Sequence, residues 1–307
     1  NQNLKKKNQL LLITALSYYL ALVLSTANLS GDMMIYKELF ISSNDTGFIQ
    51  FFKTQRKEIL YSIYSFLLSK LTNGAFDFYV GFTVFIMYFI FFKSIVFLSK
   101  KHLLETNKAN TIILLIGFFP PLFHLNGIIF RQNLALFILF FGFSYFEKKS
   151  FKLLLTALIA SLFHYIAFPI FLLSLFKKSI FKIKNLVKIF ISFFFIYNYG
   201  FLFLEFLSYF SESFKYLFLR IVRYNVYDNF DNSSVEKMIV PILFFLFQLF
   251  ISIITYFKKK SFFSFLYLKY SILFLSIYIF VDYNVLEYRL ILINYFFIPF
   301  VIIEFLE

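Results

Sequence analysis

The chain has 307 residues, of which 61% are hydrophobic and only 15% are charged. A soluble domain carries roughly a quarter charged residues, so this composition excludes one and indicates a polytopic membrane protein. The net charge of +14 comes mainly from lysines in short loops beside apolar segments, where it sets orientation and gives no reason to expect nucleic acid as a partner. Membrane lipids, through their anionic headgroups, are the expected counter-charge. Cysteine is absent, which excludes disulfides and cysteine metal sites.

The first apolar segment, residues 9–29, follows Lys5, Lys6 and Lys7 and is expected to be a retained span with a cytoplasmic N-terminus. Residues 30–77 are then expected to form an external segment, in which the amphipathic stretch 59–71 lies at the membrane interface. The crossings expected next are 78–99 inward, 111–123 outward and 127–146 inward.

Residues 152–176 lie between two lysine-rich loops that both read as cytoplasmic. The charge bias therefore favours two short helices that meet near His164 and return to the same side. One continuous span is the alternative, and it would place residues 177–188 outside.

The remaining crossings are expected at 186–204, 238–257, 262–281 and 289–306, and Lys269 is expected to snorkel inward. A second external segment is expected at residues 205–237. The sequence thus predicts an all-α polytopic membrane helix bundle with about ten transmembrane helices. Residues 1–307 would form one integral membrane domain with both termini cytoplasmic.

Lysine and arginine lie on opposite sides in this topology, whose orientation follows from the lysines alone. The chain has 25 Lys and five Arg, and every Arg falls outside or at the outer edge of a span. Arginine offers a planar, permanently charged fork that suits phosphate or carboxylate. The arginines are therefore candidate anion ligands at the outer face: Arg56, Arg131, Arg220, Arg223 and Arg289.

Arg131 is the best candidate, because it lies about one turn into an apolar helix beside Gln132 and Asn133. An ionisable group at that depth needs a cavity or a partner. A snorkelling Arg131 is the alternative. His164 lies in a long apolar stretch, where it either lines a cavity at the helix break or simply bonds a backbone carbonyl.

Two further residues, Arg289 and Glu58, carry both a functional and a plain interpretation. Arg289 either binds an anion or pairs locally with Glu287, and Tyr295 lies about two turns later on the same span. Glu58 is either a catalytic carboxylate or a surface charge. Arg223 is placed to reach a substrate, whereas Arg56 and Arg220 read as interfacial. No metal-ligand cluster stands out, so neither a metal nor another cofactor is expected.

Four stretches in this order resemble the EpsG/Wzy-type family of O-antigen and exopolysaccharide polymerases. They are "KEILYSIYSFLLSKLTNGAF" with Glu58, "NGIIFRQNLALFILFFGFSYFEKK" with Arg131, "ALIASLFHYIAF" with His164 and "EYRLILINYFFIPF" with Arg289. The resemblance implies a GT-C-like membrane glycosyltransferase in the bacterial inner membrane, with its site facing the periplasm. It would join undecaprenyl-pyrophosphate-linked oligosaccharide repeat units by moving the growing glycan onto a new unit.

On this hypothesis, Arg131 and Arg289 clamp the donor pyrophosphate and Arg223 assists them. Either His164 or Glu58 accepts the proton of the attacking hydroxyl. Substrate-binding roles are also assigned to Gln132 and Tyr295. A chain-length regulator is a candidate protein partner. The alternatives are a flippase or transporter of the same lipid-linked oligosaccharide, and a membrane O-acyltransferase of the same glycan.

Overall fold

The structure is a computed structural model, and every regular element in its described part is an α-helix. The described residues are 2–27, 32–55, 58–102, 104–118, 130–146, 150–175, 188, 191, 202, 205–212, 215, 234–280 and 284–306. The all-α class predicted from the composition is therefore confirmed. Most of the predicted outward span at 186–204 and most of the second external segment lie outside the described residues.

Two compact units divide the chain, one over residues 1–176 and one over residues 177–307. The prediction of a single integral membrane domain stays a prediction. Within the described residues, 7–25 and 76–101 are the helical stretches long and apolar enough to cross a membrane. The total of about ten crossings, the position of the termini and the inner-membrane location also stay predictions.

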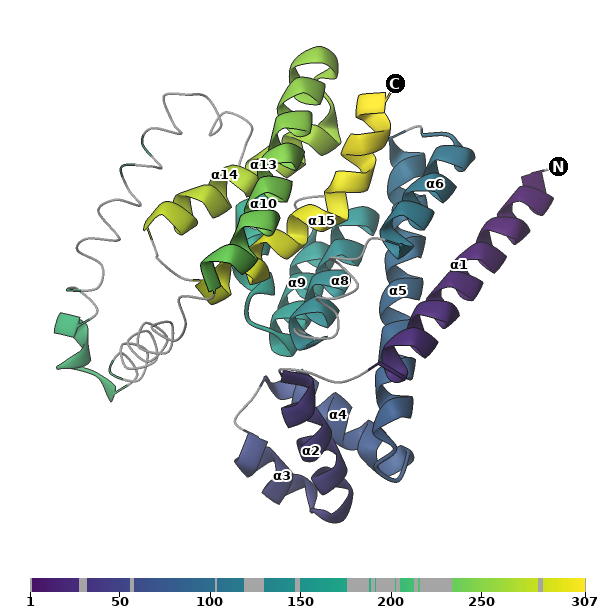
Figure 1. Cartoon of the computed structure of the whole chain (residues 1–307). Coiled ribbons are helices and arrows are strands. Elements are labelled where there is room, and N and C mark those ends of the chain that lie inside the picture. The colour runs from purple at the N-terminus through teal and green to yellow at the C-terminus, as the bar shows by residue number, and fades with distance from the viewer. Residues whose placement is uncertain are drawn as a thin grey trace. The chain divides into compact units, whose positions relative to one another are not determined.

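The first unit is built on a long helix, α5 (Phe76–Lys101), and α1 (Gln2–Ser25) packs along it (Figure 1). The predicted external segment folds into three short helices grouped at the beginning of α5. These are α2 (Asp32–Asp45), α3 (Phe48–Gln55) and α4 (Ile59–Leu71), and α4 has the bounds predicted for the amphipathic stretch. Ser69 joins α4 to α2, because its hydroxyl donates to the Phe40 carbonyl at 2.6 Å.

The other face of α5 packs against α8 (Phe130–Tyr145), and α6 (Thr106–Gly117) also contacts α5. Aromatic rings fill the α5–α8 contact. Phe91 stacks on Phe137 with centroids 4.6 Å apart, and Phe140 meets Phe91 edge-on at 5.0 Å. All three side chains are fully buried, so this contact fixes α8 against α5 by packing.

The predicted break near His164 is confirmed. Helix α9 (Phe151–Phe163) ends there and α10 (Ala167–Leu175) begins three residues later. His164 has an extended backbone, with φ −162° and ψ 125°, so the α9 helix cannot continue through it. The short connection leaves the two helices in contact with each other, and α9 also packs against α4 and α8.

The second unit contains α13 (Ser234–Lys259), α14 (Phe262–Phe280) and α15 (Asn284–Leu306), which contact one another. The last helix begins at Asn284, so Arg289 lies inside it and does not lead it. The expectation that Lys269 snorkels is wrong, because its side chain is only 1% exposed. Its ammonium lies over the Tyr270 ring, 5.9 Å from the centroid, and this contact compensates part of the burial of the charge.

Gly142 allows α8 and α9 to approach closely, which yields a test of the fold. A Cβ at Gly142 would lie 2.8 Å from Thr156 Cγ2, and the Thr156 hydroxyl is held by the Lys152 carbonyl at 2.8 Å. Gly142→Ala should lower the free energy of unfolding by about 1–3 kcal/mol through overpacking, measured by unfolding in detergent. Gly47→Ala is the control, because nothing lies within 4 Å of its Cβ.

A second substitution tests whether a collision with Thr156 causes the loss of stability in Gly142→Ala. Adding Thr156→Ser to Gly142→Ala removes the colliding methyl group and keeps the hydroxyl, so part of the stability should return. If Thr156→Ser fails to improve the Gly142→Ala protein, the α8–α9 contact is not as close as described.

Candidate functional site

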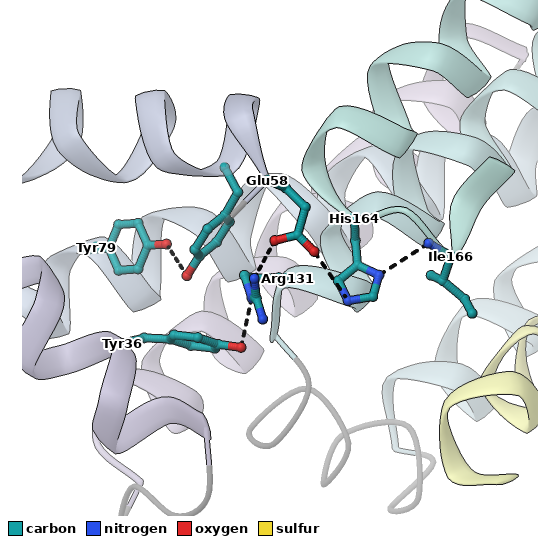
Figure 2. A network of polar contacts seen from close by, with 7 residues as sticks. Tyr36, Glu58, Tyr79, Arg131, His164 and Ile166 are labelled. Atoms are coloured by element: carbon teal, nitrogen blue, oxygen red, sulfur yellow. Dashed lines mark hydrogen bonds and ion pairs between the residues drawn. The ribbon is translucent and has the colours of Figure 1, made fainter. Parts of the chain in front are cut away.

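Three residues that the sequence singled out meet in the first unit. Glu58 precedes α4, Arg131 lies in the first turn of α8 and His164 lies between α9 and α10 (Figure 2). Their side chains are 14%, 16% and 4% exposed, respectively. Helices α4 and α8 each pack against both α5 and α9. The helix contacts that build the unit therefore also bring these three side chains together.

Glu58 stands at the centre of the group. Its Oε2 forms a charge-assisted hydrogen bond with Arg131 Nη1, and its Oε1 lies 3.6 Å from His164 Nε2. Glu58 occupies the N-cap position of α4, but its side chain makes no hydrogen bond to the helix backbone. The carboxylate is therefore directed at the two basic side chains, and the alternative interpretation of Glu58 as a surface charge does not hold.

The hydrogen bonding of His164 assigns its tautomer. The backbone N–H of Ile166 donates to His164 Nδ1 at 3.3 Å, so Nδ1 carries the lone pair of the neutral ring. The ring proton is then on Nε2, which faces the Glu58 carboxylate. The His164 Nε2–H group thus lies 3.6 Å from Glu58 Oε1, slightly beyond hydrogen-bond distance.

Arg131 is held from several directions. Its Nε donates to the hydroxyl of Tyr36, on α2, at 2.8 Å. The rings of Tyr36 and Tyr61 lie against the guanidinium, with centroids 5.1 Å and 5.5 Å from Cζ. These contacts and the ion pair with Glu58 compensate the burial of the charge, so the snorkelling alternative is not what the structure shows.

Hydrogen-bonded hydroxyl groups extend from Tyr61, beside Arg131, to α5. Tyr79 donates to Tyr61 at 3.0 Å and also lies 3.0 Å from the Ser65 hydroxyl. Burial raises the pKa of Tyr61 to about 12, so this phenol stays neutral at physiological pH. Glu58 is therefore the counter-anion of Arg131 within the described part of the site.

A small cavity lies beside these tyrosines, with space of about 10 Å³, which is roughly enough for one water molecule. A sugar ring does not fit into it, so a glycan must reach Arg131 from a different side. The residues that line the cavity are Tyr36, Leu39, Phe40, Phe51, Tyr61, Ser65 and Tyr79.

The other predicted site residues are not brought to this group by any described contact. Gln132 is buried in α8, next to Arg131, and Tyr295 is buried in α15 of the second unit. Arg289 lies in α15 with its side chain outside the described part, and Arg223 lies outside the described residues. Their binding roles stay predictions. Among the described residues, no group of three or more His, Asp or Glu gathers as metal ligands.

Sequence reasoning missed Tyr36 and Tyr61. Tyr61 lies in the stretch "KEILYSIYSFLLSKLTNGAF", three residues after Glu58, and this spacing was the signal that could have identified it. Tyr36 had no such signal, because 22 tyrosines are spread along the chain and it lies 95 positions before Arg131.

The Glu58–Arg131 contact can be tested by a double-mutant cycle. Arg131→Ala and Glu58→Ala should each lower stability by about 3 kcal/mol, because each leaves a largely buried charge without its partner. The double variant should be less destabilised than the sum of the two, measured by unfolding in detergent. Strictly additive effects would contradict the ion pair.

The sequence similarity of this chain to a known family covers far more than the site. A family model described as the EpsG family matches residues 9–307, a range that includes Glu58, Arg131 and His164. No curated protein matches the chain. No solved structure matches it either. Because the match covers nearly the whole sequence, the chain belongs to the EpsG family, as the resemblance of its motifs predicted.

Proposed function

We propose that the protein is a membrane glycosyltransferase that polymerises lipid-linked oligosaccharide repeat units. Membership of the EpsG family suggests a polymerase-like role in making exopolysaccharide or O-antigen, and the apolar helices suggest a membrane protein. The observation that carries the finer proposal is the meeting of Glu58, Arg131 and His164. A cation, a carboxylate and an imidazole within contact distance are the groups that transfer from an anionic leaving group requires.

The donor in this proposal is a glycan attached to undecaprenyl pyrophosphate at the outer face of the bacterial inner membrane. The acceptor is a hydroxyl on the non-reducing sugar of a second lipid-linked unit. The hydroxyl oxygen bonds to the anomeric carbon of the donor as the bond from that carbon to the pyrophosphate oxygen breaks. The leaving pyrophosphate takes the electron pair, and the hydroxyl proton passes to a base on the protein.

Arg131 stabilises the leaving group. Its guanidinium is planar and permanently charged, and its Nη2 has no hydrogen-bond partner among the described residues. A pyrophosphate oxygen that reaches this nitrogen gains a charge-assisted bond, which strengthens as negative charge develops on the leaving group. We further propose that Arg289 and Arg223 contribute to holding the pyrophosphate, and Gln132 and Tyr295 to binding the glycan.

Glu58 is the base in this mechanism and His164 orients it. The Nδ1 lone pair of His164 already accepts the Ile166 N–H, and its Nε2 carries a proton, so the neutral ring has no lone pair to offer the acceptor. Glu58 is an anionic acceptor with two oxygens, each able to accept more than one hydrogen bond. Arg131 hydrogen-bonds one oxygen of Glu58, and the Nε2–H of His164 faces the other oxygen at 3.6 Å.

Arg131→Ala should abolish long glycan chains and leave single-repeat products, because leaving-group stabilisation is lost while the acceptor unit is still delivered. The measurement is gel electrophoresis of the surface glycan in a deletion strain that carries each variant at equal protein level. Arg131→Lys is the matched control: if lysine restores the ladder, positive charge suffices and the planar fork is not needed.

The same gel separates this function from its competitors. Loss of the ladder with one repeat retained supports a polymerase. Loss of every repeat in the Arg131→Ala strain supports a flippase. A full ladder in that strain contradicts the role of Arg131 altogether.

Glu58→Gln and His164→Gln should differ in severity. Glu58→Gln keeps the shape and removes the proton-accepting charge, so polymerisation should fall about 10²-fold or more. His164→Gln keeps an N–H donor in reach of Glu58 and should leave a weaker but visible ladder. The reverse order, with His164→Gln the more severe change at equal protein level, would make His164 the base.

A further inference from the structure

We infer that Tyr36 is a positioning residue that fixes Arg131 so that the donor pyrophosphate meets one end of its guanidinium. This inference deepens the proposed function and rests on it. Tyr36 lies on α2, before Glu58 in the sequence, and it belongs to none of the motifs that predicted the site. Its relevance comes from two separate contacts with Arg131, one through its hydroxyl and one through its ring (Figure 2).

The hydroxyl contact sets the rotation of the guanidinium. Arg131 Nε donates to the Tyr36 oxygen at 2.8 Å, and the Tyr36 ring centroid lies 5.1 Å from Cζ. A long arginine side chain normally loses rotamer freedom when it binds a ligand. Here that freedom is restricted in the folded protein, before an anion arrives, so the side chain is preorganised.

The helix that carries Tyr36 is itself firmly attached. Phe40 lies one turn further along α2, on the same face as Tyr36, and its ring packs 4.4 Å from that of Tyr79. The Phe40 carbonyl accepts from Ser69 at 2.6 Å, and the Asn44 carbonyl accepts from Lys70 at 2.5 Å. These contacts join α2 to α4 and α5, so Tyr36 holds a defined position relative to Arg131.

The contact leaves one approach for an anion. Tyr36 occupies Nε, and Glu58 occupies one N–H of Nη1, while Nη2 has no partner among the described residues. A phosphate that binds arginine with two oxygens uses two neighbouring N–H groups. With Nε engaged, the pair formed by Nε and its neighbouring N–H is closed, and the anion meets Nη2, which shares Cζ with the Nη1 that bonds Glu58. The leaving oxygen and the base are thereby held on the same side of Arg131.

Tyr36→Phe tests this inference because it keeps the ring and removes only the oxygen. The matched control is Tyr64→Phe, which removes a phenolic oxygen from α4 that pairs with the Thr83 hydroxyl at 2.6 Å and has no contact with Arg131 among the described interactions. Both variants are made in the full-length protein in lipid nanodiscs. The readouts are the unfolding temperature and the kcat and KM for undecaprenyl-pyrophosphate-linked repeat units, per amount of folded protein.

We expect kcat of Tyr36→Phe to fall about tenfold, as for the loss of a hydrogen bond to a charged group, with KM and the unfolding temperature close to those of Tyr64→Phe. Equal kcat values for the two variants overturn the inference. A lower unfolding temperature with unchanged kcat per folded molecule also overturns it, because Tyr36 would then be structural only. Failure of the unaltered protein to polymerise lipid-linked repeat units refutes the proposed function itself, and normal polymerisation by Arg131→Ala refutes the role of Arg131. A loss in Arg131→Ala without one in Tyr36→Phe refutes this inference alone.

Discussion

The hydrogen-bonded ion pair between Glu58 and Arg131 is the constraint on which the first unit depends. Glu58 comes from the segment before α4 and Arg131 from α8, and both side chains are largely buried. A charge removed from water without a partner costs several kcal/mol, so neither residue tolerates its position alone. The pair therefore links the short helices α2–α4 to α8, and His164 and the tyrosines are arranged around it.

Much of this arrangement could be predicted from sequence because it follows from lengths and charges. The bounds of α4 follow from an amphipathic stretch, and the break at His164 follows from a short apolar segment between two lysine-rich loops. Glu58, Arg131 and His164 stood out as isolated ionisable groups in apolar sequence. Their meeting depends on the packing of α4 and α8 with α9, and no local pattern encodes such long-range contacts.

The remaining features depend on backbone geometry and helix packing, or involve a residue type so common in this chain that the sequence does not single one out. The sequence left both His164 and Glu58 as candidates for the base. The proposal that Glu58 is the base rests on the Ile166 N–H, which reaches His164 Nδ1 because the chain turns directly after this extended residue. Lys269 looked like a snorkelling residue, since its distance from the lysine loop is short, but helix packing buries it. Tyr36 is one phenol among many, and only its location distinguishes it.

The separation of the site residues along the chain has a consequence for biosynthesis. Glu58 is synthesised 73 positions before Arg131, and His164 follows later still. Until α8 has left the ribosome, the Glu58 carboxylate lacks the Arg131 guanidinium that compensates its burial in the folded unit. The docking of α2–α4 onto the rest of the first unit is thus delayed until α8 and α9 are in place. A nascent chain cannot acquire a finished site before its first half is complete.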